Sequence, residues 1–126
     1  MSGNEGAVPG APDRTPRWGL ARVVNDSMRP GLLPGDRVLL GYRRTPRPGD
    51  VVVARLPGDV VAIKRASERR TTELGEPGWW LLSDNAEAGS DSRRYGAVSD
   101  DDVLAVAIRR IWPLWRRAPV PDSTGA

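Results

Sequence analysis

The 126-residue chain contains no cysteine and no histidine. Without cysteine it can form no disulfide, no thiolate metal site and no cysteine nucleophile. Without histidine it can hold neither a Ser–His–Asp triad nor a histidine-ligated zinc ion. A hydrolase built from this sequence must therefore use a carboxylate, an amine or a metal-bound water as its base.

Lysine is almost absent as well. Of the 19 Lys and Arg residues, only Lys64 is a lysine. Arginine stays protonated in proteins, whereas a buried lysine can lose its proton and act as a base. Lys64 is therefore a candidate for acid–base chemistry.

The net charge of +3 and the pI near 10.1 raise the question of a nucleic-acid partner. The arginines, however, occur as pairs spread along the chain, near acidic residues or turns. No aromatic-interleaved RNA-binding pattern and no zinc-finger spacing is present. The pattern favours solvated surface arginines. A non-catalytic basic β-domain that binds nucleic acid is the alternative, and it would leave Lys64 dispensable.

No stretch approaches the ~20 apolar residues that span a bilayer. The first sixteen residues also lack the apolar centre of a signal peptide. We therefore expect a soluble, cytoplasmic protein without a transmembrane segment. Trp112 and Trp115, followed by Arg116 and Arg117, leave peripheral membrane contact open. Packing of a terminal strand is the favoured interpretation of this cluster.

Twelve prolines and fourteen glycines favour short strands joined by turns. Alternation and β-branched content predict six strands, at 20–25, 37–42, 51–56, 60–66, 79–82 and 103–112. The turn signal Pro57-Gly58-Asp59 predicts that 51–56 and 60–66 form a hairpin. Helix is limited to a turn after Met28 and another around 99–102. The fold class is thus mostly β, closing on one core, with a domain at 18–117 and flexible tails at 1–17 and 118–126.

Ser27 lies in the segment Asn-Asp-Ser-Met-Arg-Pro at 25–30, where a predicted strand ends. The chain then enters a turn that Pro30 and Gly31 help define, so the serine projects from a fixed corner. Such a serine can serve as a nucleophile. Taken alone, the position is more typical of a helix N-cap or turn serine.

Lys64 lies within the predicted strand 60–66. Because i±2 neighbours share a strand face, Lys64 shares its row with Ala62 and Ala66, and Arg65 faces the other way. Desolvation in an apolar row lowers the pKa of a lysine toward the neutral, basic form. The alternative is a lysine whose stem lies along a sheet edge while its ammonium reaches water.

A polar segment follows the strand at 79–82. It reads Ser-Asp-Asn at 83–85 and Ser-Asp-Ser-Arg at 90–93, with Gly96 beyond. Asp91 and Arg93 are spaced to pair with each other or with the backbone. Alone, the segment is an ordinary polar loop.

Taken in order, these segments resemble the bacterial type I signal peptidase family. The resemblance rests on Ser-Met-x-Pro followed by Pro-Gly-Asp, then Ile-Lys-Arg, then the Asp-Asn…Ser-Asp-Ser-Arg…Gly loop. It spans about residues 23–113. It implies coiled antiparallel sheets and hydrolysis by a Ser–Lys dyad, with Ser27 as nucleophile and Lys64 as general base. No cofactor and no metal is implied for the enzyme.

The resemblance also implies supporting roles. Asn25 falls where the family commonly has a serine that assists the oxyanion hole. The amide of Asn25 and the backbone N–H of Ser27 are therefore expected to hold the oxyanion. Asp91, Ser92 and Arg93 match the loop that braces the site, a structural role. The substrate is expected to bind as an extended strand along a sheet edge.

Two positions depart from the family pattern. Ser83 stands where the loop often begins with glycine. Gly89 stands where family members often place a serine that orients the lysine, although Ser90 is adjacent. The group that orients Lys64 is therefore left open by the sequence.

A compact chain without a membrane anchor most resembles the subgroup that matures nickel-type superoxide dismutase. That resemblance implies a cytoplasmic bacterial precursor whose short N-terminal propeptide is removed, with the nickel superoxide dismutase precursor as the expected partner. The interval of 37 residues between Ser27 and Lys64 also resembles that of self-cleaving, repressor-type peptidases. A self-cleaving or regulatory peptidase is therefore an alternative.

Overall fold

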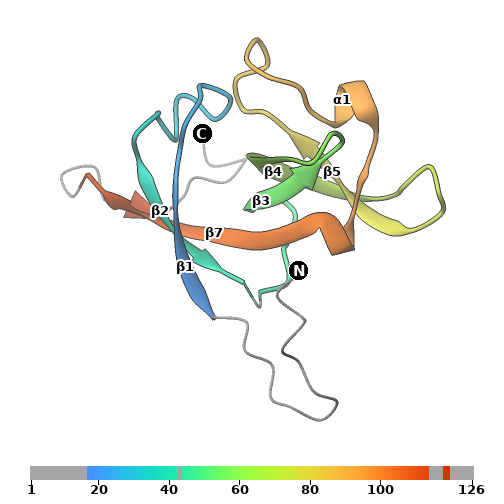
Figure 1. Cartoon of the computed structure of the whole chain (residues 1–126), viewed down its shortest axis with the longest axis horizontal. Helices are drawn as coiled ribbons and strands as arrows, with labels where there is room; N and C mark the ends of the chain where they lie inside the picture. The colour runs from blue at the N-terminus through green and yellow to red at the C-terminus, as the bar shows by residue number, and fades with distance from the viewer. Residues whose placement is uncertain (1–16, 43, 114–117, 120–126) are drawn as a thin grey trace.

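The structure is a computed structural model that describes residues 17–42, 44–113 and 118–119. These residues form one antiparallel sheet in the order β1-β2-β7-β3-β4-β5-β6, with β8 also paired to β7 (Figure 1). The strands are β1 (Trp18–Arg22), β2 (Arg37–Gly41), β3 (Val51–Leu56), β4 (Val60–Thr71), β5 (Pro77–Leu82), β6 (Val98–Ser99), β7 (Val103–Trp112) and β8 (Ala118–Pro119). A short helix, α1 (Ser92–Tyr95), and a 3₁₀ turn, η2 (Asp100–Asp102), lie between β5 and β7.

The predicted mostly-β class is confirmed, and each predicted strand is present. The predicted hairpin is also confirmed, since β3 pairs with β4 from Leu56↔Val60 to Val51↔Arg65. Its turn contains Gly58 and Asp59, both at positive φ (84° and 66°). The turn expected near residues 99–102 is η2, and Leu32 N–H donates to Met28 O in the turn expected after Met28. Helix α1 was not predicted.

The central strands are buried on both faces. Along β3, alternate residues enter two different clusters. Val51 and Val53 pack in the first, whose other members are Val23, Met28, Leu32, Val38, Leu40, Ala105 and Ala107. Val52, Ala54 and Leu56 pack in the second, whose other members are Ala66, Trp79, Leu81, Val98 and Val106. The prediction of a single core is therefore wrong, because a continuous apolar run can be covered on both sides.

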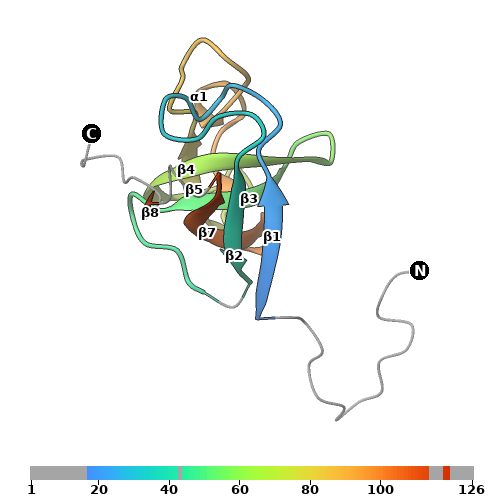
Figure 2. The same cartoon turned by 90° about the vertical axis from the view of Figure 1, so that its left-hand side faces the viewer.

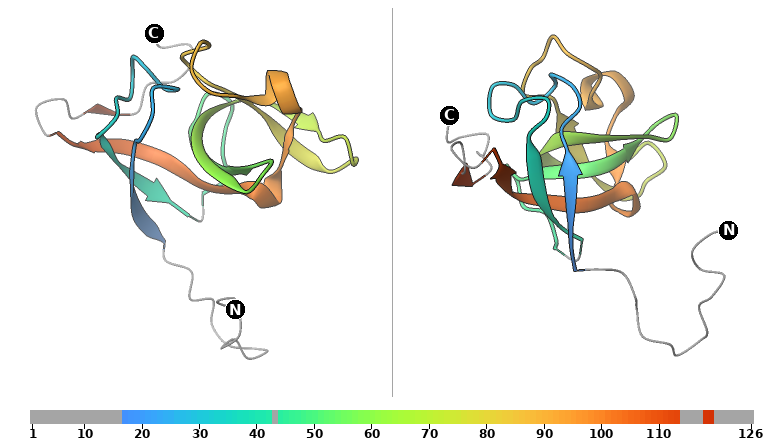
Figure 3. Two further views of the ribbon diagram at one scale, coloured as in Figure 1. Left: turned by 45° about the horizontal axis from the view of Figure 1, so that its top comes forward. Right: turned by 60° about the vertical axis from the view of Figure 1, so that its left-hand side comes forward.

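The coiling of the sheet brings distant segments together. A register shift between Ala66 and Glu68 interrupts the β4–β5 ladder, and such bulges bend a strand. The first half of β4 consequently pairs with β3 and the second half with β5. The two oblique views show β7 crossing beside both β2 and β3 (Figure 3). The loops after β1 and after β5 lie next to each other at the upper end of the molecule (Figure 2).

The expectation that the paired arginines lie in solvent is wrong for one of them. Arg110, expected to be solvated, is instead 9% exposed. Its guanidinium donates to Gly31 O and lies 3.8 Å from the buried Asp36 carboxylate, so it serves the loop after β1. The predicted tails are residues 1–17 and 118–126, and of these residues 1–16 and 120–126 lie outside the described residues, as does Trp115. Residues 118–119 form β8.

Candidate active site

Ser27 lies in the loop that connects β1 to β2, and it is buried with 3% exposure. Met28 and Leu32, each 1% exposed, anchor this loop in the first core cluster. The buried Asp36 carboxylate accepts a hydrogen bond from Leu33 N–H at 2.9 Å. The serine is thus held at a fixed corner, as the sequence predicted, by apolar burial beneath it and a carboxylate at the end of the loop.

The loop after β5 holds the backbone of the nucleophile loop. Asn85 N–H donates to Ser27 O at 2.8 Å, and the Asn85 side-chain amide donates to Asp26 O at 3.2 Å. Sequence reasoning gave Asn85 no role of its own. The Asp-Asn pair inside the loop motif was the available signal, but its partner is 58 residues away in the chain.

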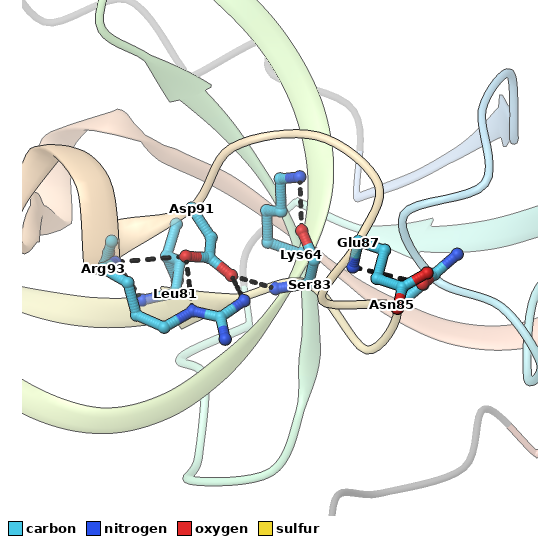
Figure 4. Close-up of polar contacts among 8 residues, drawn as sticks. Lys64, Leu81, Ser83, Asn85, Glu87, Asp91 and Arg93 are labelled. Atoms are coloured by element: carbon cyan, nitrogen blue, oxygen red, sulfur yellow. Dashed lines mark hydrogen bonds and ion pairs between the residues drawn. The ribbon is translucent and has the colours of Figure 1, made fainter.

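Lys64 lies in β4 and is 3% exposed. Its Nζ donates to Ser83 Oγ at 2.9 Å inside the protein (Figure 4). Burial lowers the pKa of Lys64 from its ordinary value, and the negative charge of Asp91 partly opposes that shift. The lysine is therefore biased toward the neutral amine that a general base requires.

Ser27 and Lys64 meet beside Gly89. A Cβ placed on Gly89 would lie 3.3 Å from Lys64 Nζ and 3.7 Å from Ser27 Cβ. The two predicted catalytic side chains thus reach within 4 Å of one point, although they come from different strands and loops. Among the described contacts, the Lys64 amine donates to Ser83 rather than to Ser27. Catalytic hydrogen bonds are often long in free enzymes and tighten when substrate binds.

Asn25 and Ser27, the expected oxyanion-hole pair, are two residues apart and are joined by a hydrogen bond. Ser27 N–H donates to Asn25 Oδ1 at 3.0 Å, so the amide oxygen of Asn25 faces the backbone donor. A substrate oxyanion that takes this N–H must displace Asn25 Oδ1. If the Asn25 side chain rotates to release this N–H, its NH₂ group can turn toward the oxyanion.

Asp91, Ser92 and Arg93 lie behind Lys64 and hold the end of β5. Asp91 accepts from Ser83 N–H at 2.9 Å and from the Arg93 guanidinium at 2.6 and 3.0 Å (Figure 4). Ser92 Oγ accepts from Leu81 N–H at 2.9 Å. Burial raises the pKa of Asp91. The hydrogen bonds from Arg93 and from the Ser83 amide, together with the charge of Arg93, lower it by more, so the pKa lies below its usual value. Asp91 is thus an anion near Lys64.

Arg65 is a site residue that sequence reasoning placed only on the face opposite Lys64. It is 4% exposed, donates to Gly49 O at 2.9 Å, and forms an ion pair with Asp84. The adjacent residues Lys64 and Arg65 therefore bond to the adjacent residues Ser83 and Asp84. The Lys-Arg dipeptide at 64–65 and the Ser-Asp dipeptide at 83–84 were visible in the sequence, but their pairing depends on the β4–β5 register.

A small apolar cavity lies beside Ser27. Its volume is about 120 Å³, and its walls come from residues 21–25, 27–28, 53 and 61–63. Val24, Val60 and Val61 are exposed near it. Within the described chain, β4 residues 60–64 pair with β3 on one side and no strand pairs on the other. A larger hollow of about 520 Å³, between residues 44–51 and 106–108, contains none of the predicted catalytic residues. We therefore associate the chemistry with the smaller cavity.

The described residues contain no cluster of three or more carboxylates placed to hold a metal ion. The structure also shows, over the same residues, no helix long and apolar enough to cross a membrane.

Ser27 and the buried Lys64 therefore lie close to each other in a mostly-β domain. The chain belongs to the Peptidase S24-like family, whose family model matches residues 7–107. It is also 33% identical over 58 residues to mitochondrial inner membrane protease subunit 1 of Schizosaccharomyces pombe (strain 972 / ATCC 24843). That match covers 46% of this chain and 37% of the relative. The expected signal peptidase-like class is thus supported at the level of a peptidase family.

Proposed function

We propose that the protein is a serine endopeptidase in which Ser27 is the nucleophile and Lys64 is the general base. The observation that carries this proposal is the convergence of the two side chains beside Gly89, with the lysine buried and its pKa lowered. Membership of a peptidase family supports the same class of reaction.

In the proposed reaction, neutral Lys64 Nζ takes the proton of Ser27 Oγ as that oxygen attacks the scissile carbonyl carbon. Ser27 N–H and the rotated Asn25 amide hold the oxyanion. The C–N bond then breaks, and Lys64 delivers its proton to the leaving amine. Water hydrolyses the resulting ester: Lys64 takes one proton from the water and returns it to Ser27 Oγ.

The substrate would lie extended along the unpaired edge of β4 at residues 60–64. Backbone hydrogen bonds to that edge align an extended peptide without reading its sequence. The cavity beside Ser27, about 120 Å³ in volume, would admit a small side chain near the scissile bond. Resemblance to the signal peptidase family supports the same preference for small residues before the cut.

For the substrate, we propose a cytoplasmic precursor that loses a short N-terminal propeptide, with the nickel superoxide dismutase precursor as the first to test. Resemblance to the subgroup that matures this enzyme is the basis for that choice. The purified protein is mixed with the precursor, and the product's N-terminus is read by mass spectrometry. Ser27→Ala and Lys64→Met are run alongside. Ser90→Ala, which changes an exposed serine near the site, is the matched control.

A new N-terminus made by wild type and Ser90→Ala, but not by the other two variants, is the expected result. Full activity in Lys64→Met would refute the dyad. Intact precursor with folded wild type would remove this substrate and leave the dyad to be tested on other precursors.

The S24-like family match favours a second candidate function, a peptidase that cuts its own chain. Its test is the same incubation without precursor. A truncated product that appears in wild type and is absent from Ser27→Ala would favour self-cleavage.

A further inference from the structure

The orientation of the Lys64 amine depends on one hydroxyl. Lys64 Nζ and Ser83 Oγ are 2.9 Å apart, and the two residues are 3% and 7% exposed. The β4–β5 ladder reaches Arg65↔Leu82, and one further step along both strands places Lys64 opposite Ser83. Directly opposed residues of an antiparallel pair point to the same face, so this register delivers the serine hydroxyl to the lysine.

The position of Ser83 is fixed by its own neighbours. Its backbone N–H donates to the buried Asp91 carboxylate at 2.9 Å, and Arg93 holds that carboxylate from the other side (Figure 4). The next residue, Asp84, is paired with Arg65. The hydroxyl is therefore attached to a backbone that two ion pairs restrain.

Other hydroxyls do not occupy this place. Gly89 lies close to the amine, since a Cβ placed on it would be 3.3 Å from Nζ, but it has no side chain and its φ is +77°. A side chain at that φ is strained. Ser90 is exposed. Among the described residues, Ser83 is the hydroxyl bonded to the amine.

A neutral amine has two N–H bonds and one lone pair, and only the lone pair can take a proton. An acceptor that holds one N–H fixes rotation about the Cε–Nζ bond, so the lone pair points in a set direction. A base oriented in this way by a third group is a general feature of activated nucleophiles. With one N–H directed to Ser83, the lone pair is free to face Ser27.

We propose that Ser83 is the positioning residue that directs the lone pair of Lys64 toward Ser27. The proposal rests on the proposed function for its catalytic consequence. It also answers what orients the lysine when position 89 is glycine.

The test compares Ser83→Ala and Ser83→Thr with wild type, and Ser90→Ala is the matched control. Steady-state cleavage is measured from pH 6 to 10 with a precursor that wild type cuts. We expect Ser83→Ala to lower kcat about 100-fold with little change in KM, because misplacement of a catalytic group has an effect of this order. Ser83→Thr should restore most of the rate because it keeps the hydroxyl.

The pH profile separates positioning from mere packing. Ser83 Oγ accepts from the amine and so favours its protonated form, as does nearby Asp91. Arg65 and Arg93, the nearby cations, are paired with Asp84 and Asp91, and none of the variants substitutes these four residues. Removing the hydroxyl should therefore shift the acidic limb of the rate profile to lower pH. A limb that moves to higher pH would indicate that water has entered a loosened pocket, and it would overturn the proposal.

A second measurement needs no substrate. Lys64 is the only lysine, so a single lysine ¹³Cε resonance reports its titration directly. Ser83→Ala should show a lower Lys64 pKa than wild type and Ser90→Ala. An unchanged pKa, or a kcat within about twofold of wild type, would overturn the role of Ser83. A wild type that cuts no precursor would instead count against the proposed function.

Discussion

Replacing Lys64 by methionine should make the protein more stable while removing its proposed base. Lys64 is 3% exposed, and burial lowers its pKa below the 10.5 of a free side chain. In the unfolded chain the ammonium is solvated and keeps its proton up to that value. Folding therefore either buries a charge or releases a proton, and both cost free energy at neutral pH. Methionine is similarly long and unbranched, and it carries no charge.

The sign of the pH dependence follows from the direction of that shift. Between the folded-state pKa and 10.5, the unfolded state binds more protons, so the stability of wild type rises with pH. The slope reaches about 1.4 kcal/mol per pH unit for one proton. Below the folded-state pKa the full cost is present, and near pH 10.5 it is gone. The excess stability of Lys64→Met should therefore fall as the pH rises through this range and disappear toward pH 10.5.

Urea unfolding of both proteins at several pH values between 6 and 10.5 measures this difference. Other titrating groups cancel because they are common to both chains; Tyr95 is one, with burial raising its pKa to about 12. At neutral pH we expect Lys64→Met to be more stable by at least about 1 kcal/mol, or about 4 °C in Tm for a domain of this size. A variant less stable than wild type at pH 7, or a difference that does not change with pH, would refute the reasoning.

Two further predictions concern the structure around the site, and both are measured by urea unfolding. Asp84→Ala removes the ion pair of Arg65, which is 4% exposed, and should cost about 3 kcal/mol. Asp59→Asn removes the charge of the exposed Arg55 pair while keeping a side chain that tolerates the positive φ of this position, and it should cost less than about 1 kcal/mol; equal losses would contradict the argument from burial. Leu81→Ala removes a fully buried side chain of the second core cluster and should cost about 2–5 kcal/mol, so a loss below about 1 kcal/mol would contradict the packing described.

The strands were predictable because their signals are local. The run Val51 to Leu56, the turn at Pro57 to Asp59 and the run from Val60 are contiguous, and together they identify the hairpin. The end of β1 was less predictable. The β-branched residues Val23 and Val24 led to a predicted strand that continues to Asn25, yet β1 ends at Arg22. Val23 is instead bonded to the loop backbone, as donor to Asp36 O and acceptor from Gly35 N–H.

Helix α1 was missed because it has only four residues, too few to show helical periodicity. Its local signal was Asp91, which caps the helix by accepting from Arg93 N–H at 3.1 Å. The two core clusters were missed for a different reason. A continuous apolar run is compatible with burial on one face or both, and only the sheet topology decides between them.

Within the site, sequence reasoning selected Ser27 and Lys64, and the structure brings both beside Gly89. The supporting contacts of Ser83 and Arg65 could not be derived in the same way. They depend on which residue of β5 lies opposite Lys64, and a shift of one residue would turn Ser83 to the other face of the sheet.

Three consecutive residues after β5 reach three different parts of the site. Ser83 accepts from the proposed base, Asp84 pairs with the arginine beside that base, and Asn85 N–H donates to the carbonyl of Ser27. The proposed base and the proposed nucleophile are 37 residues apart in sequence. Both are therefore hydrogen-bonded to a single short segment. That segment is itself held by Asp91 at the Ser83 amide. The distance between the proposed base and the proposed nucleophile is thus set locally by residues 83–85, provided that the rest of the sheet keeps β4 and β5 in register.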